Sequence, residues 1–443
     1  MSENTPLAVF QDWLESYLNF ERLPQKNIFW LDTMQFLCRR FNHPENSCRS
    51  VHVAGSKGKG SVSVMINSIL RAAGFKCGLY TSPHIVDFSE RIGTGAQPLS
   101  DAVYEAAVKE VMYSVDSIIP DTLPGNRPIT WFELVTLFAF VCFRREHADW
   151  GVFETGLGGR LDATNVLDPD VCVITPIELE HTEFLGNTVE LIAAEKAGII
   201  KPGVPVCIAP QTPGVRAVFE QKAAEAGAAV MFLDDILTDC THEFVSGGMN
   251  VRFDAPLFSR PIRTTLRLSG SFQAINAALA AAAVKTVYPD MDESLIEYGL
   301  SQAVLPGRFE VTGNPAYPVI LDGAHTVRSI MFTLETFGAL GLFGGTPPQL
   351  LFACAADKDV ASIAPLFRGF EHITLTRPGD HKQSDPDRLC KAFSAAGLSY
   401  EFIPDYAEAI RTARSRAEVC RAPLLITGSF YLLAEVKKAA PLR

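Results

Sequence analysis

The chain has few of the patterns that mark secreted, membrane-spanning or nucleic-acid-binding proteins. Its ten cysteines are scattered from Cys38 to Cys420, with no Cys-x-x-Cys pair and no cluster with histidines, which argues against a disulfide framework or a zinc site. No apolar run reaches transmembrane length, and the N-terminus lacks a basic segment followed by an apolar core. A net charge of −11 argues against general binding of nucleic acid or of a membrane surface. We therefore expect a cytoplasmic protein with reduced thiols.

The chain does carry enough apolar sequence for more than one hydrophobic core. At 443 residues it is too long for a single ordinary core, so we expect two or three domains. Hydrophobic residues make up 47% and charged residues 20%, as in a folded globular protein. Residues 1–49 look helical around a loop at residues 19–24, which is either a lid or a connector.

Apolar, β-branched runs alternate with helical patterns along most of the chain. Nearly continuous runs of this kind are typical of parallel strands buried on both faces, so the pattern predicts an α/β fold. Residues 228–268 are rich in turns and predict a small antiparallel piece, followed by a helix over residues 270–284. A break before Pro306 predicts a boundary between a first domain, residues 1–304, and a smaller Rossmann-like domain, residues 305–443. The expected strands are residues 51–54, 77–81, 151–154, 171–175 and 204–208 in the first domain, and 319–321, 350–353, 372–376 and 424–427 in the second.

The stretch from Ser50 to Ser61 combines a short β-branched run, a glycine-rich turn and the start of a helical pattern. Glycines let backbone N–H groups approach an anion, the helix N-terminus adds partial positive charge, and Lys59 adds a full one. The spacing departs from the general phosphate-loop pattern, which has four residues between the first glycine and the Gly-Lys pair. A solvated basic turn is the alternative. The residues of the expected phosphate loop are Gly55, Ser56, Lys57, Gly58, Lys59, Gly60 and Ser61.

Polar residues gather where the expected strands end. Ser82 follows the second strand, Glu154 ends the third, and His181 lies beyond the fourth. In a parallel sheet ligands bind at the carboxyl ends of the strands, so we expect these side chains to meet. Glu154 leads into a glycine-rich loop that carries Arg160 and Asp162, which suits metal holding and substrate contact. The alternatives are a polar turn for this loop and a packed or surface position for His181.

Taken together, these stretches resemble the folylpolyglutamate synthase and dihydrofolate synthase family, within the ATP-dependent Mur ligase superfamily. The resemblance runs from about Asn19 to Phe430. It implies an N-terminal ATPase domain of the phosphate-loop type, with a mostly parallel sheet and a small antiparallel piece, and a smaller C-terminal Rossmann-like domain. The motifs that carry it are Thr81-Ser82-Pro83-His84, Glu90-Arg91-Ile92, Gly158-Gly159-Arg160-Leu161-Asp162-Ala163-Thr164-Asn165, the segment around His181, Lys196-Ala197-Gly198-Ile199, Leu305-Pro306-Gly307-Arg308, Leu321-Asp322-Gly323-Ala324-His325, Asp357-Lys358-Asp359 and Gly428-Ser429-Phe430.

The resemblance implies ATP as co-substrate and Mg²⁺ as cofactor, and it leaves open a monovalent cation. Asn276 matches a position near the nucleotide base, and Arg308 and Asp322 match groups that reach the nucleotide from the second domain. One carboxylate with hydroxyl oxygens suits a hard cation, whereas histidine is a less usual magnesium ligand. The implied magnesium ligands are Ser61, Ser82, Glu154 and His181.

The resemblance also implies a catalytic group drawn from both domains. Arg308 and His325 are expected to add positive charge when the domains close. Lys196 matches a lysine that is carbamylated in relatives, and the sequence leaves open whether that happens here. Phe132 and Asp162 match positions that contact the pterin-bearing substrate. The implied catalytic residues are Lys59, Glu154, His181, Lys196, Arg308 and His325.

The implied reaction is the ATP-dependent addition of L-glutamate, through an acyl phosphate, to dihydropteroate, to a reduced folate such as a tetrahydrofolate polyglutamate, or to both. The compact length favours a bifunctional enzyme, and we expect a monomer. The chain departs from bacterial members at Ser56-Lys57, where they carry Thr-Asn, at Glu180, where Asp is usual, and at Thr326, where they mostly carry Asn. The alternatives are a Mur-type ligase acting on a cell-wall nucleotide precursor and a non-catalytic nucleotide-binding relative.

Overall fold

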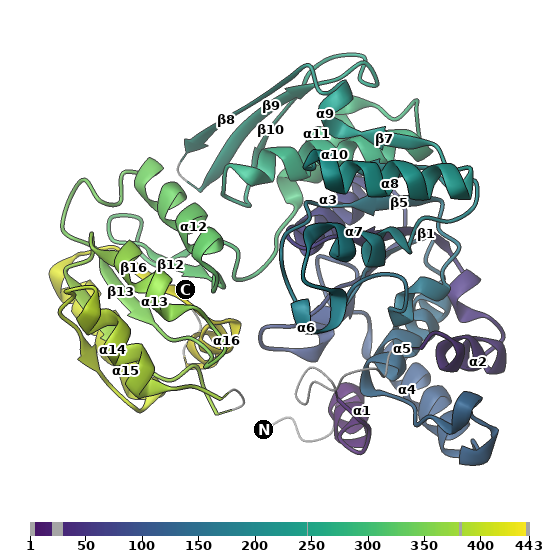
Figure 1. Cartoon of the computed structure of the whole chain (residues 1–443), viewed down its shortest axis with the longest axis horizontal. Helices are drawn as coiled ribbons and strands as arrows, with labels where there is room; N and C mark the ends of the chain where they lie inside the picture. The colour runs from purple at the N-terminus through teal and green to yellow at the C-terminus, as the bar shows by residue number, and fades with distance from the viewer. Residues whose placement is uncertain (1–4, 20–29, 246, 381–382, 440–443) are drawn as a thin grey trace.

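The computed structural model describes residues 5–19, 30–245, 247–380 and 383–439, and its strands form three sheets (Figure 1). A seven-stranded sheet and a small antiparallel sheet belong to the N-terminal part, and a six-stranded sheet belongs to the C-terminal part. This confirms the predicted α/β fold with a small antiparallel piece. The last helix before the second large sheet is α11 (Glu293–Gln302), and the first strand of that sheet is β11 (Glu310–Thr312). A domain boundary at residues 304 and 305 stays a prediction.

The glycine loop follows the central strand of the seven-stranded sheet. After this strand, β1, the chain forms β2, β3 and β4, which lie to one side of β1 in the strand order. It then forms β5, β6 and β7, which lie to the other side. The carboxyl ends of β1, β4 and β5 therefore border the crevice where open α/β sheets bind ligands. All neighbours are parallel except the edge pair β3 and β2. The strand order is β3 (Ile92–Gly93), β2 (Cys77–Tyr80), β4 (Trp150–Glu154), β1 (Arg49–Ala54), β5 (Val171–Ile174), β6 (Val206–Ile208) and β7 (Val230–Phe232).

One prediction about the first domain is wrong in part. Of residues 228–268, the short run Val230–Phe232 forms β7, which pairs in parallel with β6 at the edge of the main sheet. The remainder forms the expected antiparallel sheet of β8 (Asp239–Val245), β9 (Gly248–Asp254) and β10 (Ile262–Leu266). Three apolar residues give too little pattern to separate a parallel edge strand from a hairpin. The loop expected at residues 19–24 lies, from residue 20 on, outside the described residues.

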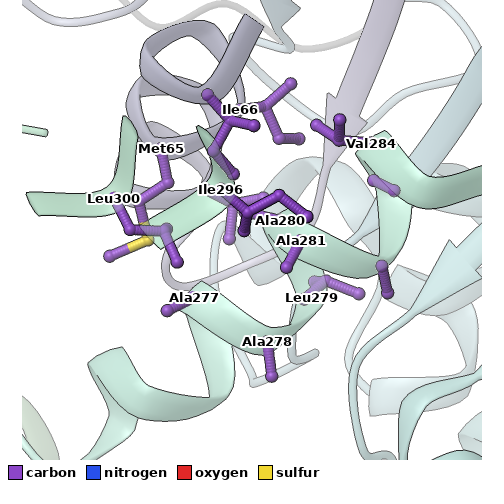
Figure 2. Close-up of a cluster of buried hydrophobic side chains, with 14 of the residues drawn as sticks. Met65, Ile66, Ala277, Ala278, Leu279, Ala280, Ala281, Val284, Ile296 and Leu300 are labelled. Carbon is purple, nitrogen blue, oxygen red and sulfur yellow. The ribbon is translucent and has the colours of Figure 1, made fainter. Parts of the chain in front are cut away.

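Alternate residues of the main sheet face two different helical layers, as the two-residue period of a strand requires. On one face lie α3 (Lys59–Ala72), α10 (Phe272–Val287) and α11. The small alanines of α10 pack against α3, and Met65 and Ile66 of α3 also lie close to Ile296 and Leu300 of α11 (Figure 2). Each of these large side chains is buried, which contributes about 1.5–3 kcal/mol apiece. This packing fixes the helix that begins in the glycine loop.

The other face of the main sheet is covered by two groups of helices. One group packs on β2 and β4 and contains α1 (Pro6–Leu14), α2 (Asp32–Arg40), α4 (Asp101–Asp116) and α5 (Trp131–Glu146). The second group packs on β5 and β6 and contains α7 (Val189–Ala197) and α8 (Pro213–Ala226). The short helices α6 (Thr182–Leu185) and α9 (Leu233–Ile236) lie in the connections of this part.

The C-terminal sheet is also covered on both faces, as expected for a Rossmann-like domain. Its order is β11, β12 (Val319–Asp322), β16 (Leu424–Thr427), β13 (Gln349–Phe352), β14 (His372–Leu375) and β15 (Glu401–Phe402), with only β11 antiparallel to its neighbour. Its helices are α12 (Val327–Ala339), α13 (Val360–Ile363), α14 (Pro386–Ala395), α15 (Tyr406–Cys420) and α16 (Phe430–Ala439). Across the described ranges of both parts, every helix is too short or too polar to cross a bilayer.

Candidate active site

The glycine loop between β1 and α3 has a shape that requires glycine at two positions. Gly55 has φ +144° and Gly58 has φ +89°. A side chain at Gly55 would lie 1.8 Å from the hydroxyl oxygen of Thr175, and one at Gly58 would lie 2.9 Å from the amide oxygen of Asn276. Both the backbone angles and the close neighbours therefore exclude larger residues. Because α3 begins at Lys59, the unpaired N–H groups of its first turn are available to an anion.

Two lysines share one backbone acceptor at this loop. The Nζ of Lys59 donates to the Gly55 carbonyl oxygen at 3.1 Å, and the Nζ of Lys196 donates to the same oxygen at 2.8 Å. Lys196 is 1% exposed and also donates to Glu180 Oε1 at 2.9 Å. Burial, helped by nearby Lys59 and opposed by Glu180, lowers the pKa of Lys196 to about 8. Lys196 thus forms one half of a buried ion pair, and its carbamylation stays a prediction.

Glu154 ends β4 as a buried carboxylate beside the glycine loop. Its Oε2 accepts the backbone N–H of Ser82 at 3.2 Å. Burial raises the pKa of Glu154, while the positive charges of Lys59 and Arg308 act in the opposite direction. A side chain at Gly60 would lie 3.4 Å from the same Oε2. The structure therefore brings Glu154, Ser82 and the phosphate loop together, as the strand ends predicted.

The side chains expected to hold Mg²⁺ line one cavity. Among the described residues, no group of three or more His, Cys, Asp and Glu side chains could hold a metal ion by itself. Magnesium in phosphoryl-transfer sites is usually bound by one or two carboxylates together with substrate phosphates and water. The buried carboxylate of Glu154, with the hydroxyl groups of Ser61 and Ser82 in the same cavity lining, fits such a site. His181, exposed at the start of α6, is the least suited of the four donors.

Arg308 and Asp322 reach the same cavity from the six-stranded sheet. The guanidinium of Arg308 lies 4.5 Å from the ring centre of Phe430. Asp322 accepts two backbone N–H groups, that of Phe309 at 2.7 Å and that of the second residue after Asp322 at 2.8 Å. Burial raises the pKa of Asp322 and lowers that of Arg308, against the attraction between the two groups. The carboxylate of Asp322 thus fixes the turn that presents Arg308.

His325 corrects one expectation about charge. Its Nδ1 lies 2.7 Å from the carbonyl oxygen of Gly323, so the ring donates from this nitrogen. Burial lowers the pKa of His325 to about 4, even though the bond to Gly323 favours the charged form. The ring is therefore neutral near pH 7, and the expectation that it adds positive charge is wrong for this structure. Of the two groups, Arg308 alone carries the charge.

The residues expected to contact a pterin lie around the loop that follows β4. Asp162 accepts the N–H groups of Gly156 and Leu157, each at 2.9 Å, and that of Thr164 at 3.0 Å. A side chain at Gly156 would lie 2.4 Å from the ring of Phe132. The carboxylate of Asp162 therefore organises the loop backbone, and the ring of Phe132 lies directly against it.

One cavity of 840 Å³ joins the two parts of the chain. The site residues named from the sequence line it, with three exceptions. Gly55 and Lys196 are buried outside the lining, and Arg160 is exposed and pairs with Glu195 at 3.0 Å. Such a volume is within the range of small-molecule sites. The structure thus assembles phosphate-binding, metal-binding and substrate-binding candidates in one space, with walls from both large sheets.

The cavity has further walls that the sequence did not predict. Arg328 of α12 pairs with Glu178 at 2.8 Å, and the rings of Phe272 and Phe332 meet with centroids 5.4 Å apart, so both contacts join the two parts of the chain. Glu133, in the first turn of α5, also lines the cavity, and burial raises its pKa to about 7. Of these residues, only Glu133 has a recognisable sequence pattern, because it closes a capping box that begins with a threonine three residues earlier.

Comparison with known proteins places the whole chain in one family. Residues 53–284 match the Mur ligase middle domain, and residues 307–430 match the glutamate ligase domain of Mur ligases. The chain is 33% identical to the dihydrofolate synthase/folylpolyglutamate synthase of Bacillus subtilis, over 97% of this chain and 99% of that protein. It is 31% identical to a probable bifunctional folylpolyglutamate synthase/dihydropteroate synthase of Haloferax volcanii, over 92% of this chain but only 48% of that protein.

A solved structure gives the same result for the architecture. The folylpolyglutamate synthase of Mycobacterium tuberculosis complexed with ADP superposes with a TM-score of 0.86 at 27% identity, over 98% of each chain. These relatives support the folate-family resemblance and not the cell-wall alternative. The chain belongs to the folylpolyglutamate synthase/dihydrofolate synthase family of Mur ligases and is an ATP-dependent acid–amino-acid ligase.

Proposed function

We propose that this ligase joins L-glutamate to dihydropteroate, to reduced folates such as tetrahydrofolate polyglutamates, or to both. The observation that carries the proposal is the single cavity in which the glycine loop and Glu154 face Arg308, with Phe132 and Asp162 in the same lining. The names of the relatives support the choice of substrates. The reaction needs ATP, an acceptor carboxylate and an amino acid at one place, and this cavity holds the expected contacts for ATP and for the pterin-bearing acceptor together.

The first step forms an acyl phosphate. A carboxylate oxygen of the acceptor attacks the γ-phosphorus of ATP, the bond to the oxygen that bridges to the β-phosphorus breaks, and ADP leaves. Lys59 and the N-terminus of α3 bind the phosphates and offset their negative charge. Bound Mg²⁺ would neutralise further charge on the phosphate oxygens, and the donors that fit it are Ser61, Ser82, Glu154 and His181.

The second step forms the amide. The neutral amine of L-glutamate attacks the acyl carbon, inorganic phosphate leaves, and the amine loses a proton. Arg308 offsets the charge of the leaving phosphate from the C-terminal side. Because Nδ1 of His325 donates to a backbone carbonyl, its other ring nitrogen is an acceptor that suits the N–H of the incoming amine.

Two broader proposals concern the setting of the enzyme. All ten cysteines are free, which supports a reducing cytoplasm as the place where it works. The monomeric state remains part of the proposal, and light scattering at several concentrations tests it. Carbamylation of Lys196 and a requirement for a monovalent cation also remain proposals, tested by mass spectrometry and by replacing potassium with a large organic cation.

The test of the function is phosphate release from ATP and Mg²⁺ with L-glutamate, using dihydropteroate and tetrahydrofolate as separate acceptors. We expect turnover with both, which would establish a bifunctional enzyme. Turnover with one would identify a monofunctional enzyme and direct attention to Glu180 and Thr326 as the positions that differ from most bacterial members. A folded protein that binds ATP but turns over neither acceptor would contradict the proposal.

A further inference from the structure

The loop that carries Ser82 is a single hydrogen-bonded unit. The carboxylate of Glu90 accepts three consecutive backbone N–H groups, those of residues 85–87, at 2.7, 3.0 and 2.9 Å. At the base of the loop, the N–H of Thr81 donates to the carbonyl oxygen of Arg91 at 3.0 Å. A carboxylate that holds three amides makes this backbone stiff, because a shift of any one of them breaks a charge-assisted bond. Displacement of the loop at residue 85 is therefore transmitted to Ser82.

Ile85 belongs to the N-terminal part of the chain, but its side chain packs on the C-terminal part. It lies against the apolar cluster that contains Leu321 of β12 and Leu433 of α16. A side chain at Gly307 would lie 2.7 Å from Cδ1 of Ile85, so the isoleucine rests directly on the backbone that leads into Arg308. The contact has no room for a larger residue on the C-terminal side.

The turn that contacts Ile85 is also held by hydrogen bonds. The N–H of Gly307 donates to Glu310 Oε2 at 2.8 Å, and the carbonyl oxygen of Gly307 accepts the N–H of Gly323 at 2.9 Å. The next residue, Arg308, stacks over Phe430. The turn that presents Arg308 is thus tied to the end of β12 and to the start of α16.

We propose that Ile85 is a positioning residue that fixes Ser82 and Arg308 relative to each other and to Glu154. Docking of the C-terminal sheet against Ile85 holds the Ser82 loop, whose N–H reaches Glu154 at 3.2 Å, and the same contact holds the Arg308 turn. The proposal rests on the proposed function for what Ser82 and Arg308 do in the reaction. The packing of Ile85 is independent of that function.

Three variants separate this role from general stability. Ile85→Ala removes the contact with the C-terminal cluster, and Ile85→Leu keeps its volume. Val86→Ala is the matched control, because Val86 is 37% exposed and its N–H is held by the same Glu90 carboxylate. The measurements are phosphate-release kinetics, ATP affinity by calorimetry, thermal unfolding, and amide hydrogen exchange of residues 85–87 and 307–310.

For Ile85→Ala we expect kcat to fall at least tenfold while the Kd for ATP stays within twofold and the melting temperature barely changes. Amide exchange should become faster in both segments, although only one of them contains the substitution. Ile85→Leu should restore kcat to within threefold of the parent, and Val86→Ala should leave all four measurements unchanged.

The proposal is overturned if Ile85→Ala keeps kcat within twofold, or if exchange rises in residues 85–87 alone. If the parent enzyme turns over none of the acceptors, the proposed function fails but the exchange experiment still decides the role of Ile85. Faster exchange in both segments would then support the coupling, and unchanged exchange would reject it.

Discussion

At the scale of single residues, Lys59 places a positive charge at the expected phosphate loop of a chain whose net charge is −11. Its Nζ donates to the carbonyl oxygen of Gly55, within the loop that is expected to receive phosphate. Among the described residues, this is the one hydrogen bond of the Lys59 side chain, and it forms no ion pair there, so its loss should leave the fold intact. Lys59 therefore offers a clean test of the phosphate role.

We expect Lys59→Ala to lower kcat roughly a hundredfold or more, because losing one charge that stabilises the transition state costs about 3 kcal/mol. Phosphate release with saturating substrates measures the effect, and circular dichroism checks folding. Lys109→Ala, on the exposed face of α4, is the control for removing a lysine. Near-normal turnover of the Lys59 variant would reject its role.

Residue-level prediction from sequence succeeded where a motif had several ordered parts. Ser82 and Glu154 were identified because each follows or ends a strand, Asp322 was identified by its match to a family motif, and the structure places all three in one cavity. Arg328 and Phe332 were missed because an exposed arginine and an aromatic on a helix have no pattern that indicates a cavity wall. The neutral state of His325 was missed because it depends on burial between segments far apart in the sequence.

At the scale of elements, α3 is flanked by two glycines with nearly equal backbone angles. Gly58 has φ +89° before the helix and Gly74 has φ +90° after it. A side chain at Gly58 would meet Asn276 at 2.9 Å, whereas one at Gly74 would meet nothing within 4 Å. The two positions therefore impose similar backbone strain but differ in their surroundings.

We expect Gly58→Ala and Gly74→Ala to lose similar stability, about 1–2 kcal/mol each from a left-handed residue with a side chain. Only Gly58→Ala should also weaken ATP binding, by tenfold or more, because its methyl group displaces Asn276 and narrows the loop. Calorimetric titration with ATP and thermal unfolding separate the two effects. Equal ATP affinity in the two variants would contradict the role of the loop.

The connection between α10 and α11 is closed by a buried ion pair whose contribution varies with pH. Lys285 and Glu293 meet at 2.8 Å, and Glu293 also accepts the N–H and hydroxyl of Ser259. Burial alone would raise the pKa of Glu293, but the bonds from Lys285 and Ser259 hold it at about 2, below its ordinary 4.5. Because the folded-state pKa is depressed, the stabilisation is present above pH 4.5 and is lost as the pH falls through 2.

We expect Glu293→Gln to lower the free energy of unfolding by about 3 kcal/mol at pH 7, and by about 1 kcal/mol less at pH 4. Urea unfolding at the two pH values measures the difference. Replacing both partners with apolar residues, as in Lys285→Met with Glu293→Leu, should recover only part of the loss. No buried charge is left unpaired, but Ser259 and the carbonyl oxygens of Pro289 and Met291 lose their hydrogen-bond partners. An effect of equal size at both pH values would show that charge is not its cause.

Within the two large sheets, the strands of four or more residues were predicted to within about two residues, and so was the three-residue strand β6. β1 and β5 were found because several consecutive apolar residues are buried on both faces. The strands that were missed are β3 and β15, with two residues each, and β7 and β11, with three, all at sheet edges and with little period to see. Their position depends on pairing with strands that are distant in sequence.

At the scale of the whole molecule, the two large parts meet around the cavity through contacts of unequal strength. The pair Glu178–Arg328 joins them at 2.8 Å, but the side chain of Arg328 is 65% exposed. Exposed ion pairs contribute about 0–1 kcal/mol, so this pair should have only a small effect on how closely the two parts approach each other. Packing of Ile85 is the contact that we expect to dominate.

We expect Arg328→Ala to raise the KM for ATP or L-glutamate by no more than about fivefold, and less at high salt because ions screen an exposed pair. The exchanged pair, Glu178→Arg with Arg328→Glu, should recover the original KM at low salt, whereas Glu178→Arg alone should worsen it. Kinetics at low and high salt test both statements. A hundredfold effect of Arg328→Ala would instead indicate direct contact with a substrate.

The short outer strands described above have a consequence for self-association. Both large sheets end in strands of two or three residues, β3 and β7 in one and β11 and β15 in the other. Such stubs offer another chain too few free backbone groups for a stable intermolecular ladder, so these sheets resist edge-to-edge aggregation. The exposed edge strand β8 is seven residues long and carries Asp239, His242 and Glu243, whose polar side chains discourage pairing. Any strand-to-strand aggregation through the described sheets should therefore begin at β8, away from the ATP-binding strands.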